Sequence, residues 1–128
     1  MPRILLIDDD PQILDLLKDV LMEAGHECWC AENGAIGFKA LERMSFDLVV
    51  TDLIMPEAEG IETIMRIRRR WSHLPILAIS GGIPGVPGNF LPAASRLGAD
   101  RVLSKPFEIT IFMQIVGELL GESAQSAP

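Results

Sequence analysis

The sequence predicts an α/β fold, a doubly wound five-stranded parallel sheet with helices on both faces. Two observations predict it. Short apolar runs alternate five times with longer segments of helical periodicity, so that each strand is followed by a helix. The chain has 128 residues, of which 48% are hydrophobic and 23% charged, which suits one domain with a single core and excludes intrinsic disorder.

Five short segments are predicted to be strands. The first, Ile4–Ile7, is a continuous apolar run, which is typical of a buried strand, whereas the second is a weaker signal. Pro75 directly precedes the fourth segment. The five predicted strands are Ile4–Ile7, Glu27–Ala31, Leu48–Thr51, Ile76–Ile79 and Arg101–Ser104.

Capping residues mark where the helices between these strands begin and end. The first helix begins at Pro11, because Asp10 can cap it and proline suits the first helical position, and Gly25 ends it. Residues 1–121 are expected to form one domain, and the small, polar residues 122–128 a flexible tail or linker. The remaining helices are predicted at Gly34–Met44, capped by Asn33, and at Ile61–Trp71, Phe90–Leu97 and Pro106–Leu120.

Composition limits the classes of function. Eighteen acidic and eleven basic side chains give a net charge of −7, so direct binding to DNA or RNA is not expected, because an acidic surface repels phosphate. No apolar run approaches the ~18 residues of a membrane span, and Ile4–Ile7 is too short for a signal peptide. Cys28 and Cys30 would face the same side of a strand without disulfide geometry. These features predict a reduced, cytoplasmic protein.

Charged and polar side chains directly follow the predicted strands. In a doubly wound fold, ligands bind at the carboxyl ends of the strands, which meet at one edge of the sheet. A single aspartate after a strand is usually a turn former or a helix cap, and this is our interpretation of Asp10. The combination at one edge, rather than any single residue, predicts a site. Its residues are Asp8, Asp9, Asp52, Ser80 and Lys105.

This set of side chains points to metal-assisted phosphoryl chemistry. Asp8, Asp9 and Asp52 would repel one another, which raises the pKa of at least one carboxyl unless positive charge compensates, and Lys105 supplies only one charge. Clustered oxygen ligands without nitrogen or sulfur suit a hard cation such as Mg²⁺. The set also fits phosphoryl transfer to a carboxylate, in which one aspartate is the nucleophile, a metal neutralises charge, and a lysine and a hydroxyl hold the phosphoryl oxygens.

On these residues the sequence resembles the receiver domain of response regulators, the CheY-like phosphoacceptors of two-component phosphorelay signalling. The resemblance runs from about Arg3 to Leu120. Each motif is weak alone, but all of them in order at the family's spacing are specific. The matching stretches are Ile4–Asp10, Val49–Pro56 with Gly60, Ile76–Ser80, Gly98–Asp100 and Ser104–Phe107.

The resemblance implies a fold and a function. The sheet would have the flavodoxin-like order 2-1-3-4-5. Asp52 would take a phosphoryl group from a histidine kinase or a histidine phosphotransfer protein in a Mg²⁺-dependent reaction, and the change would switch partner interactions. The domain would thus be a signalling phosphoacceptor rather than an enzyme.

The resemblance also implies a ligand set for Mg²⁺. Asp9 would bind the ion directly, and Asp8 would act mainly through water. Asp52 and the backbone carbonyl of Ile54 would supply the other protein ligands.

Around the phosphoryl group, the resemblance implies contacts from Ser80 and Lys105, and a cis peptide bond between Lys105 and Pro106. Val102 departs from the pattern, because the family usually carries an aromatic residue three positions before the lysine. Ring rotation at this position is therefore not expected to transmit the signal. The segment Gly81–Asn89 is unusually long and rich in glycine and proline, and we expect it to change shape on phosphorylation.

Three alternatives remain open. A flavodoxin-like nucleotide or flavin binder would need phosphate-binding glycines or hydroxyls after the first strand, where aspartates stand instead. A haloacid-dehalogenase-like phosphatase uses an Asp-x-Asp motif, which Asp8 and Asp10 satisfy formally, but it leaves Asp52 unexplained. A degenerate receiver, acting only as a protein-interaction module, is favoured by Val102 and disfavoured by the complete acidic set.

The last helix is the predicted partner surface, for a homodimer or an effector. Its apolar arc spans roughly 200°, which is wider than a helix lying on a sheet usually buries. An apolar rim would therefore remain at the surface. The stripe expected to face the sheet is Ile111, Phe112, Ile115 and Leu119, and the residues that widen it are Ile109, Met113, Val116 and Leu120.

Four arginines crowd the end of the third predicted helix, where positive charge suits the helix dipole. We interpret them as a solvated helix end rather than as a binding patch. They are Arg66, Arg68, Arg69 and Arg70.

Overall fold

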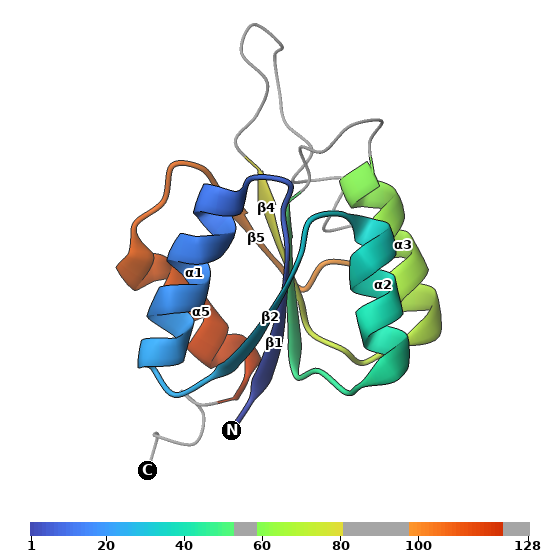
Figure 1. The fold of residues 1–128 in the computed structure, drawn as a ribbon, viewed down its shortest axis with the longest axis horizontal. Coiled ribbons are helices and arrows are strands. Elements are labelled where there is room, and N and C mark those ends of the chain that lie inside the picture. The colour runs from blue at the N-terminus through green and yellow to red at the C-terminus, as the bar shows by residue number, and fades with distance from the viewer. Residues whose placement is uncertain (53–58, 81–97, 122–128) are drawn as a thin grey trace, which may run out of the picture.

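The computed structural model describes residues 1–52, 59–80 and 98–121. Within them, five parallel strands form one sheet in the order 2-1-3-4-5, which confirms the predicted fold class and strand order. All the carboxyl ends consequently lie at one edge of the sheet, the upper edge in Figure 1. The strands are β1 (Arg3–Ile7), β2 (Glu27–Ala31), β3 (Leu48–Asp52), β4 (Ile76–Ser80) and β5 (Arg101–Ser104).

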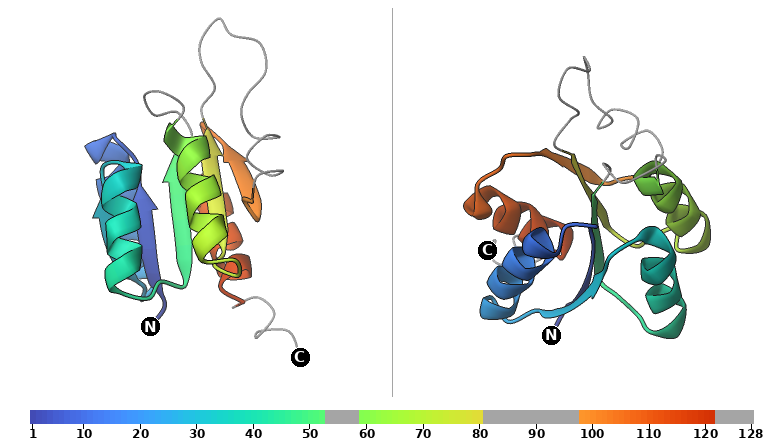
Figure 2. Two further views of the ribbon diagram at one scale, coloured as in Figure 1. Left: turned by 90° about the vertical axis from the view of Figure 1, so that its right-hand side faces the viewer. Right: turned by 45° about the horizontal axis from the view of Figure 1, so that its top comes forward.

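The described helices lie in pairs on the two faces of the sheet (Figures 1 and 2). Helices α1 (Pro11–Glu23) and α5 (Ile109–Leu119) cover one face. Helices α2 (Gly34–Arg43) and α3 (Glu59–Arg70) cover the other. None of these helices is long and apolar enough to cross a membrane.

Each face of the sheet carries its own buried cluster, because successive side chains of a strand point to opposite faces. In β1, Ile4 and Leu6 pack towards α1 and α5, whereas Leu5 and Ile7 pack in the other cluster. The side chains of β1, β3 and β4 are thus buried on both faces, which explains why these strands are nearly continuous apolar runs in the sequence.

The predicted caps of the first two helices are confirmed. Asp10 accepts a hydrogen bond from the backbone N–H of Gln12 at 2.9 Å, and Pro11 occupies the first turn of α1. Asn33 accepts from the N–H of Ile36 at 2.8 Å at the start of α2. Gly25 has a φ of +93° directly after α1, a backbone conformation that glycine adopts without strain.

Several sequence predictions fall on residues outside the described ranges. These are the backbone carbonyl of Ile54, the segment Gly81–Asn89, the helix Phe90–Leu97 and the tail 122–128.

Two helices begin at residues other than those predicted, and three end one residue earlier than predicted: α2 at Arg43, α3 at Arg70 and α5 at Leu119. Helix α3 begins at Glu59, two residues before the predicted start, and ends at Arg70. Helix α5 begins at Ile109 rather than Pro106, because Glu108 has an extended backbone (ψ 141°) and acts as the N-cap residue. Phe107, before the helix, instead packs beside Phe112, with the two ring centroids 5.7 Å apart.

The predicted buried stripe of α5 also needs correction. Ile111 is 42% exposed, whereas Phe112, Ile115 and Val116 form the buried side of the helix. At 100° per residue, Ile111 lies about a quarter turn from the centre of that side, which places it at the edge facing solvent. Met113 is only partly buried, in agreement with a partly exposed apolar rim.

One of the four arginines is not part of a solvated helix end. The Arg68 guanidinium donates hydrogen bonds to the backbone carbonyls of Gly98 (2.7 Å) and Ser72 (2.8 Å) and to the carboxylate of Asp100 (2.8 Å). Arg68 therefore ties the end of α3 to the chain entering β5. Arg66, Arg69 and Arg70 are exposed, as predicted.

Candidate functional site

Three aspartates meet at the carboxyl edge of the sheet. Asp8 and Asp9 directly follow β1, and Asp52 is the last residue of the neighbouring strand β3. One carboxylate oxygen from each lies within 4.8 Å of the others. The prediction that these strand ends bring three carboxylates together is therefore confirmed.

The three carboxylates differ in exposure. Asp8 and Asp52 are buried, 5% and 4% exposed, whereas Asp9 is exposed. A hydrogen bond holds the Asp8 side chain in place, because its Oδ1 accepts from the backbone N–H of Asp10 at 2.9 Å. Asp10 itself caps α1 and is not a member of the cluster, as predicted. The cluster thus has two buried carboxylates, those of Asp8 and Asp52, and one carboxylate, that of Asp9, which is open to solvent.

Lys105 brings a positive charge onto this cluster from the end of β5. Its Nζ lies 3.2 Å from Oδ2 of Asp52 and 3.6 Å from Oδ2 of Asp8. The backbone N–H of Lys105 donates to the carbonyl of Ser80 at 2.8 Å, which fixes where the side chain begins. The peptide bond between Lys105 and Pro106 is cis, as the family resemblance implied.

Ser80 ends β4 at the same edge. Ile79 lies opposite Asp52 in the β3–β4 register, so Ser80 is one residue beyond the aspartate along the neighbouring strand. Ser80 is 2% exposed and lies opposite Ser104 of β5. The sheet therefore brings together all the predicted site residues within the described ranges, and leaves only Ile54 outside them.

The charges of the site are imperfectly balanced. Burial raises the pKa of Asp8 to about 6, and the neighbouring charges of Asp52 and Asp9 push in the same direction, against the hydrogen bond from Asp10 and the charge of Lys105. Burial alone would lower the pKa of Lys105, but the charges of Asp52 and Asp8 and its hydrogen bonds to them raise it overall. The lysine therefore stays charged, and the carboxylates still repel one another.

We expect the Asp8→Asn variant to stabilise the metal-free domain near neutral pH. Between pH 3.8 and about 6 the folded state binds more protons at Asp8 than the unfolded state, so the free energy of unfolding falls as pH rises through this window. Asparagine keeps the acceptor for the Asp10 N–H and carries no charge. The expected gain at neutral pH is about 3 kcal/mol, disappearing at the acid end of the window.

Urea denaturation in chelator-treated buffer across this pH range measures the effect. Asp10→Asn makes the same change of charge outside the cluster and keeps the helix cap, so it should not show the pH-dependent gain. Equal stability of the Asp8→Asn variant and the wild type throughout the range would contradict this electrostatic interpretation.

The donor set fits a hard divalent cation. All three groups offer carboxylate oxygens, the donors that Mg²⁺ and Ca²⁺ prefer, and no histidine or cysteine joins them among the described residues. Burial is the main cause of the raised pKa of Asp8, and the charges of Asp52 and Asp9 raise it further, against the charge of Lys105. A cation placed among these oxygens would relieve that repulsion.

A parallel 2-1-3-4-5 sheet with an acidic cluster and a lysine at its carboxyl edge defines a phosphoacceptor-type signalling domain. The family model of the response regulator receiver domain matches residues 4–117. The chain belongs to this family. The match favours the receiver family over the flavodoxin-like and haloacid-dehalogenase-like alternatives that the sequence left open.

Individual relatives agree with the family assignment. The response regulator receiver protein CpdR of Brucella abortus is 33% identical over 94% of this chain and 98% of its own length. The transcriptional regulatory protein GlrR of Escherichia coli is 33% identical over 95% of this chain, which spans only 27% of that longer protein. The structure of the response regulator TrrA from Thermotoga maritima, in complex with Mg²⁺-BeF, has a TM-score of 0.82 and 32% identity, covering 93% of this chain and 99% of that one.

Proposed function

We propose that Asp52 is the phosphoacceptor of this receiver domain. The observation that carries the proposal is its position: it ends a central strand, is buried, and has the Lys105 ammonium 3.2 Å from its carboxylate, with two further carboxylates beside it. Asp8 and Asp9 sit on the same edge but come from the loop after β1, which suits them to hold a cation rather than to receive the group.

The proposed reaction is phosphoryl transfer from a phosphohistidine. A carboxylate oxygen of Asp52 forms the new bond to phosphorus, the bond between phosphorus and the histidine nitrogen breaks, and the imidazole leaves with that electron pair. Lys105, kept charged by its neighbours, can follow the negative charge from the carboxylate to the phosphoryl oxygens. Ser80, one residue beyond the level of Asp52, is proposed to donate to another of these oxygens.

Asp8, Asp9 and Asp52 are proposed to hold Mg²⁺, with the backbone carbonyl of Ile54 as a further ligand. Asp9 is proposed to bind directly, since it is the exposed member of the cluster, and Asp8 mainly through water. When bound, the ion supplies positive charge that neutralises the phosphoryl oxygens. The presence of Mg²⁺-BeF in the Thermotoga maritima relative supports this choice of cation.

Receiver domains of response regulators interact with kinases and effectors. For this chain we propose a histidine kinase or histidine phosphotransfer protein as donor, with phosphoryl transfer and self-dephosphorylation as its only chemistry. Free cysteines at Cys28 and Cys30 support a place in the reducing cytoplasm. We propose that residues 1–121 form the domain and 122–128 a tail or linker.

We further propose that the outer side of α5 contacts a partner, either an effector or a second copy of the chain. Ile111 is 42% exposed, and Met113 is partly exposed beside the core. The Ile111→Glu variant should fold normally, because the side chain lies in solvent, and should weaken self-association by about tenfold by placing a charge in the contact. Sedimentation velocity over a range of concentrations measures this effect, and a wild-type chain that stays monomeric would exclude the homodimer.

The proposed function is tested by adding beryllofluoride, a phosphoryl analogue, while recording amide NMR spectra. With Mg²⁺ present, we expect shifts centred on Asp52, Ser80 and Lys105, and no shifts without Mg²⁺. An unchanged spectrum in the presence of both ions would show that the chain is a degenerate receiver without phosphoacceptor function.

A further inference from the structure

Positive charge is concentrated on one face of this acidic chain. Helices α2 and α3 carry six of the eleven basic side chains and only three acidic ones, so together they have a net charge of +3 within a chain of −7. Helices α1 and α5, on the opposite face, carry one basic and four acidic side chains. The two helix pairs therefore present opposite charges to solvent.

The arginines of α3 stand over aromatic rings at the seam between α2 and α3. The Arg66 guanidinium lies 4.4 Å from the centre of the Phe38 ring, and that of Arg70 lies 5.2 Å from the ring of Trp71. Phe38 and Trp71 contact each other edge to face, with centroids 5.2 Å apart. Stacking on the Phe38 ring helps to hold the Arg66 guanidinium in place.

The four arginines of α3 differ in whether a carboxylate forms an ion pair with them. Arg68 is bound to Asp100, and Arg70 to Glu42 at 2.8 Å. Arg66 and Arg69, both exposed, form no ion pair with any residue of the described ranges. Together with the Phe38 ring and Arg70, they line a hollow of about 390 Å³. This hollow therefore offers two guanidinium groups that no carboxylate of the described residues neutralises, beside the ring of Phe38.

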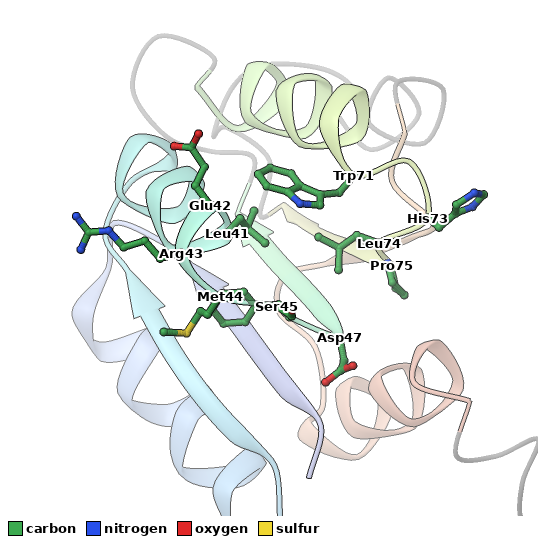
Figure 3. Close-up of a pocket in the computed structure, with 11 residues that line it drawn as sticks. Leu41, Glu42, Arg43, Met44, Ser45, Asp47, Trp71, His73, Leu74 and Pro75 are labelled. Atoms are coloured by element: carbon green, nitrogen blue, oxygen red, sulfur yellow. The ribbon is translucent and has the colours of Figure 1, made fainter.

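A second groove continues the seam away from the acidic site. Its volume is about 650 Å³. Trp71 faces Leu41 across this groove (Figure 3). The Trp71 ring also contacts Phe38, which lines the basic hollow, so Trp71 connects the two. Leu74 and Pro75 form its far wall (Figure 3). These last residues precede β4, so the groove opens at the end of the sheet opposite to Asp52. The seam thus runs from a basic hollow to a groove that is lined by apolar and polar side chains in about equal measure.

We propose that this α2–α3 seam binds an acidic polypeptide segment of a partner protein, one that carries apolar side chains next to its carboxylates. Arg66 and Arg69 would bind the carboxylates, and the apolar side chains would lie in the groove beside Trp71. Nucleic acid is the less suitable occupant, because the chain as a whole is acidic and repels a phosphate backbone. Since the seam lies away from Asp52, the partner can stay bound while the phosphoryl group is exchanged.

The test selects random phage-displayed peptides on the immobilised full-length chain, with counter-selection on the Arg66→Glu variant. We expect the enriched peptides to combine Asp or Glu with Leu, Phe or Trp. A synthetic copy of an enriched peptide should shift amide resonances on α2 and α3. Arg66→Glu should weaken its binding by about tenfold, the loss expected for a charge-assisted hydrogen bond.

Lys18→Glu on α1 is the matched control, since it makes the same change of charge on the opposite face, and it should weaken binding by less than about twofold. Three results would overturn the proposal: no enrichment of acidic peptides, shifts confined to α1 and α5, or equally tight binding of single-stranded DNA. Because the assay needs neither Mg²⁺ nor phosphorylation, its outcome is independent of whether Asp52 is the phosphoacceptor.

Discussion

Asp52→Asn is expected to abolish phosphoryl incorporation completely. Incubation of the wild type with acetyl phosphate and Mg²⁺ should add one phosphoryl group, because the buried Asp52 carboxylate ends a central strand and lies nearer to the Lys105 ammonium (3.2 Å) than the Asp8 carboxylate does (3.6 Å). Asparagine preserves the size and shape of the side chain, but its amide cannot form a stable acyl phosphate. Intact-mass spectrometry measures the result directly.

Asp10→Asn is the control for this experiment. It removes a carboxylate two residues from Asp8, at a position where the side chain caps α1 and asparagine also caps well. This variant should be phosphorylated as the wild type is. Retention of the added mass by Asp52→Asn would show that another residue is the acceptor.

The second large effect concerns Asp9. We expect Asp9→Ala to weaken Mg²⁺ binding on the order of a hundredfold, because a carboxylate a few ångströms from a cation contributes several kcal/mol at intermediate dielectric. Asp9 is exposed, so its truncation should leave the fold intact. Calorimetric titration with Mg²⁺ gives the affinity, again with Asp10→Asn as the control, and an unchanged affinity would remove Asp9 from the ligand set.

The position of the site could be predicted from the sequence because a parallel sheet places the carboxyl ends of all its strands at one edge. Once Ile4–Ile7 and Leu48–Thr51 are recognised as buried parallel strands, the residues that follow them must lie at one edge of the sheet. The expectation that repulsion raises the pKa of a carboxyl followed from the same placement. Asp52 and Asp9 do raise the pKa of Asp8, although burial is the larger cause. Neither step requires knowledge of side-chain conformations.

What could not be predicted depends on contacts between distant parts of the chain. Arg68 looked like its neighbours in the sequence, and only the approach of Gly98 and Asp100, about thirty positions away, distinguishes it. The start of α5 at Ile109, after the extended residue Glu108, was also missed, and Phe107 packs beside Phe112 instead of continuing the helix. The aromatic support of Arg66 required α2 and α3 to lie side by side, which no local pattern specifies.

Val102 limits how phosphorylation can be transmitted. Its side chain packs against the buried cluster under α2 and α3, at the position where the family usually carries an aromatic ring. No ring can rotate there, so we expect the response to the phosphoryl group to pass through other parts of the chain. The Gly81–Asn89 segment, which begins directly after Ser80, stays our predicted place for that response.

The most direct test of Asp52 as a Mg²⁺-dependent phosphoacceptor is a crystal structure of the domain with Mg²⁺ and beryllofluoride. We expect beryllium bonded to a carboxylate oxygen of Asp52, fluorine atoms in contact with Lys105 and Ser80, and Mg²⁺ bound by Asp9 and Asp52. Beryllofluoride bound at any other carboxylate, or a site without either ion at saturating concentrations, would contradict this assignment.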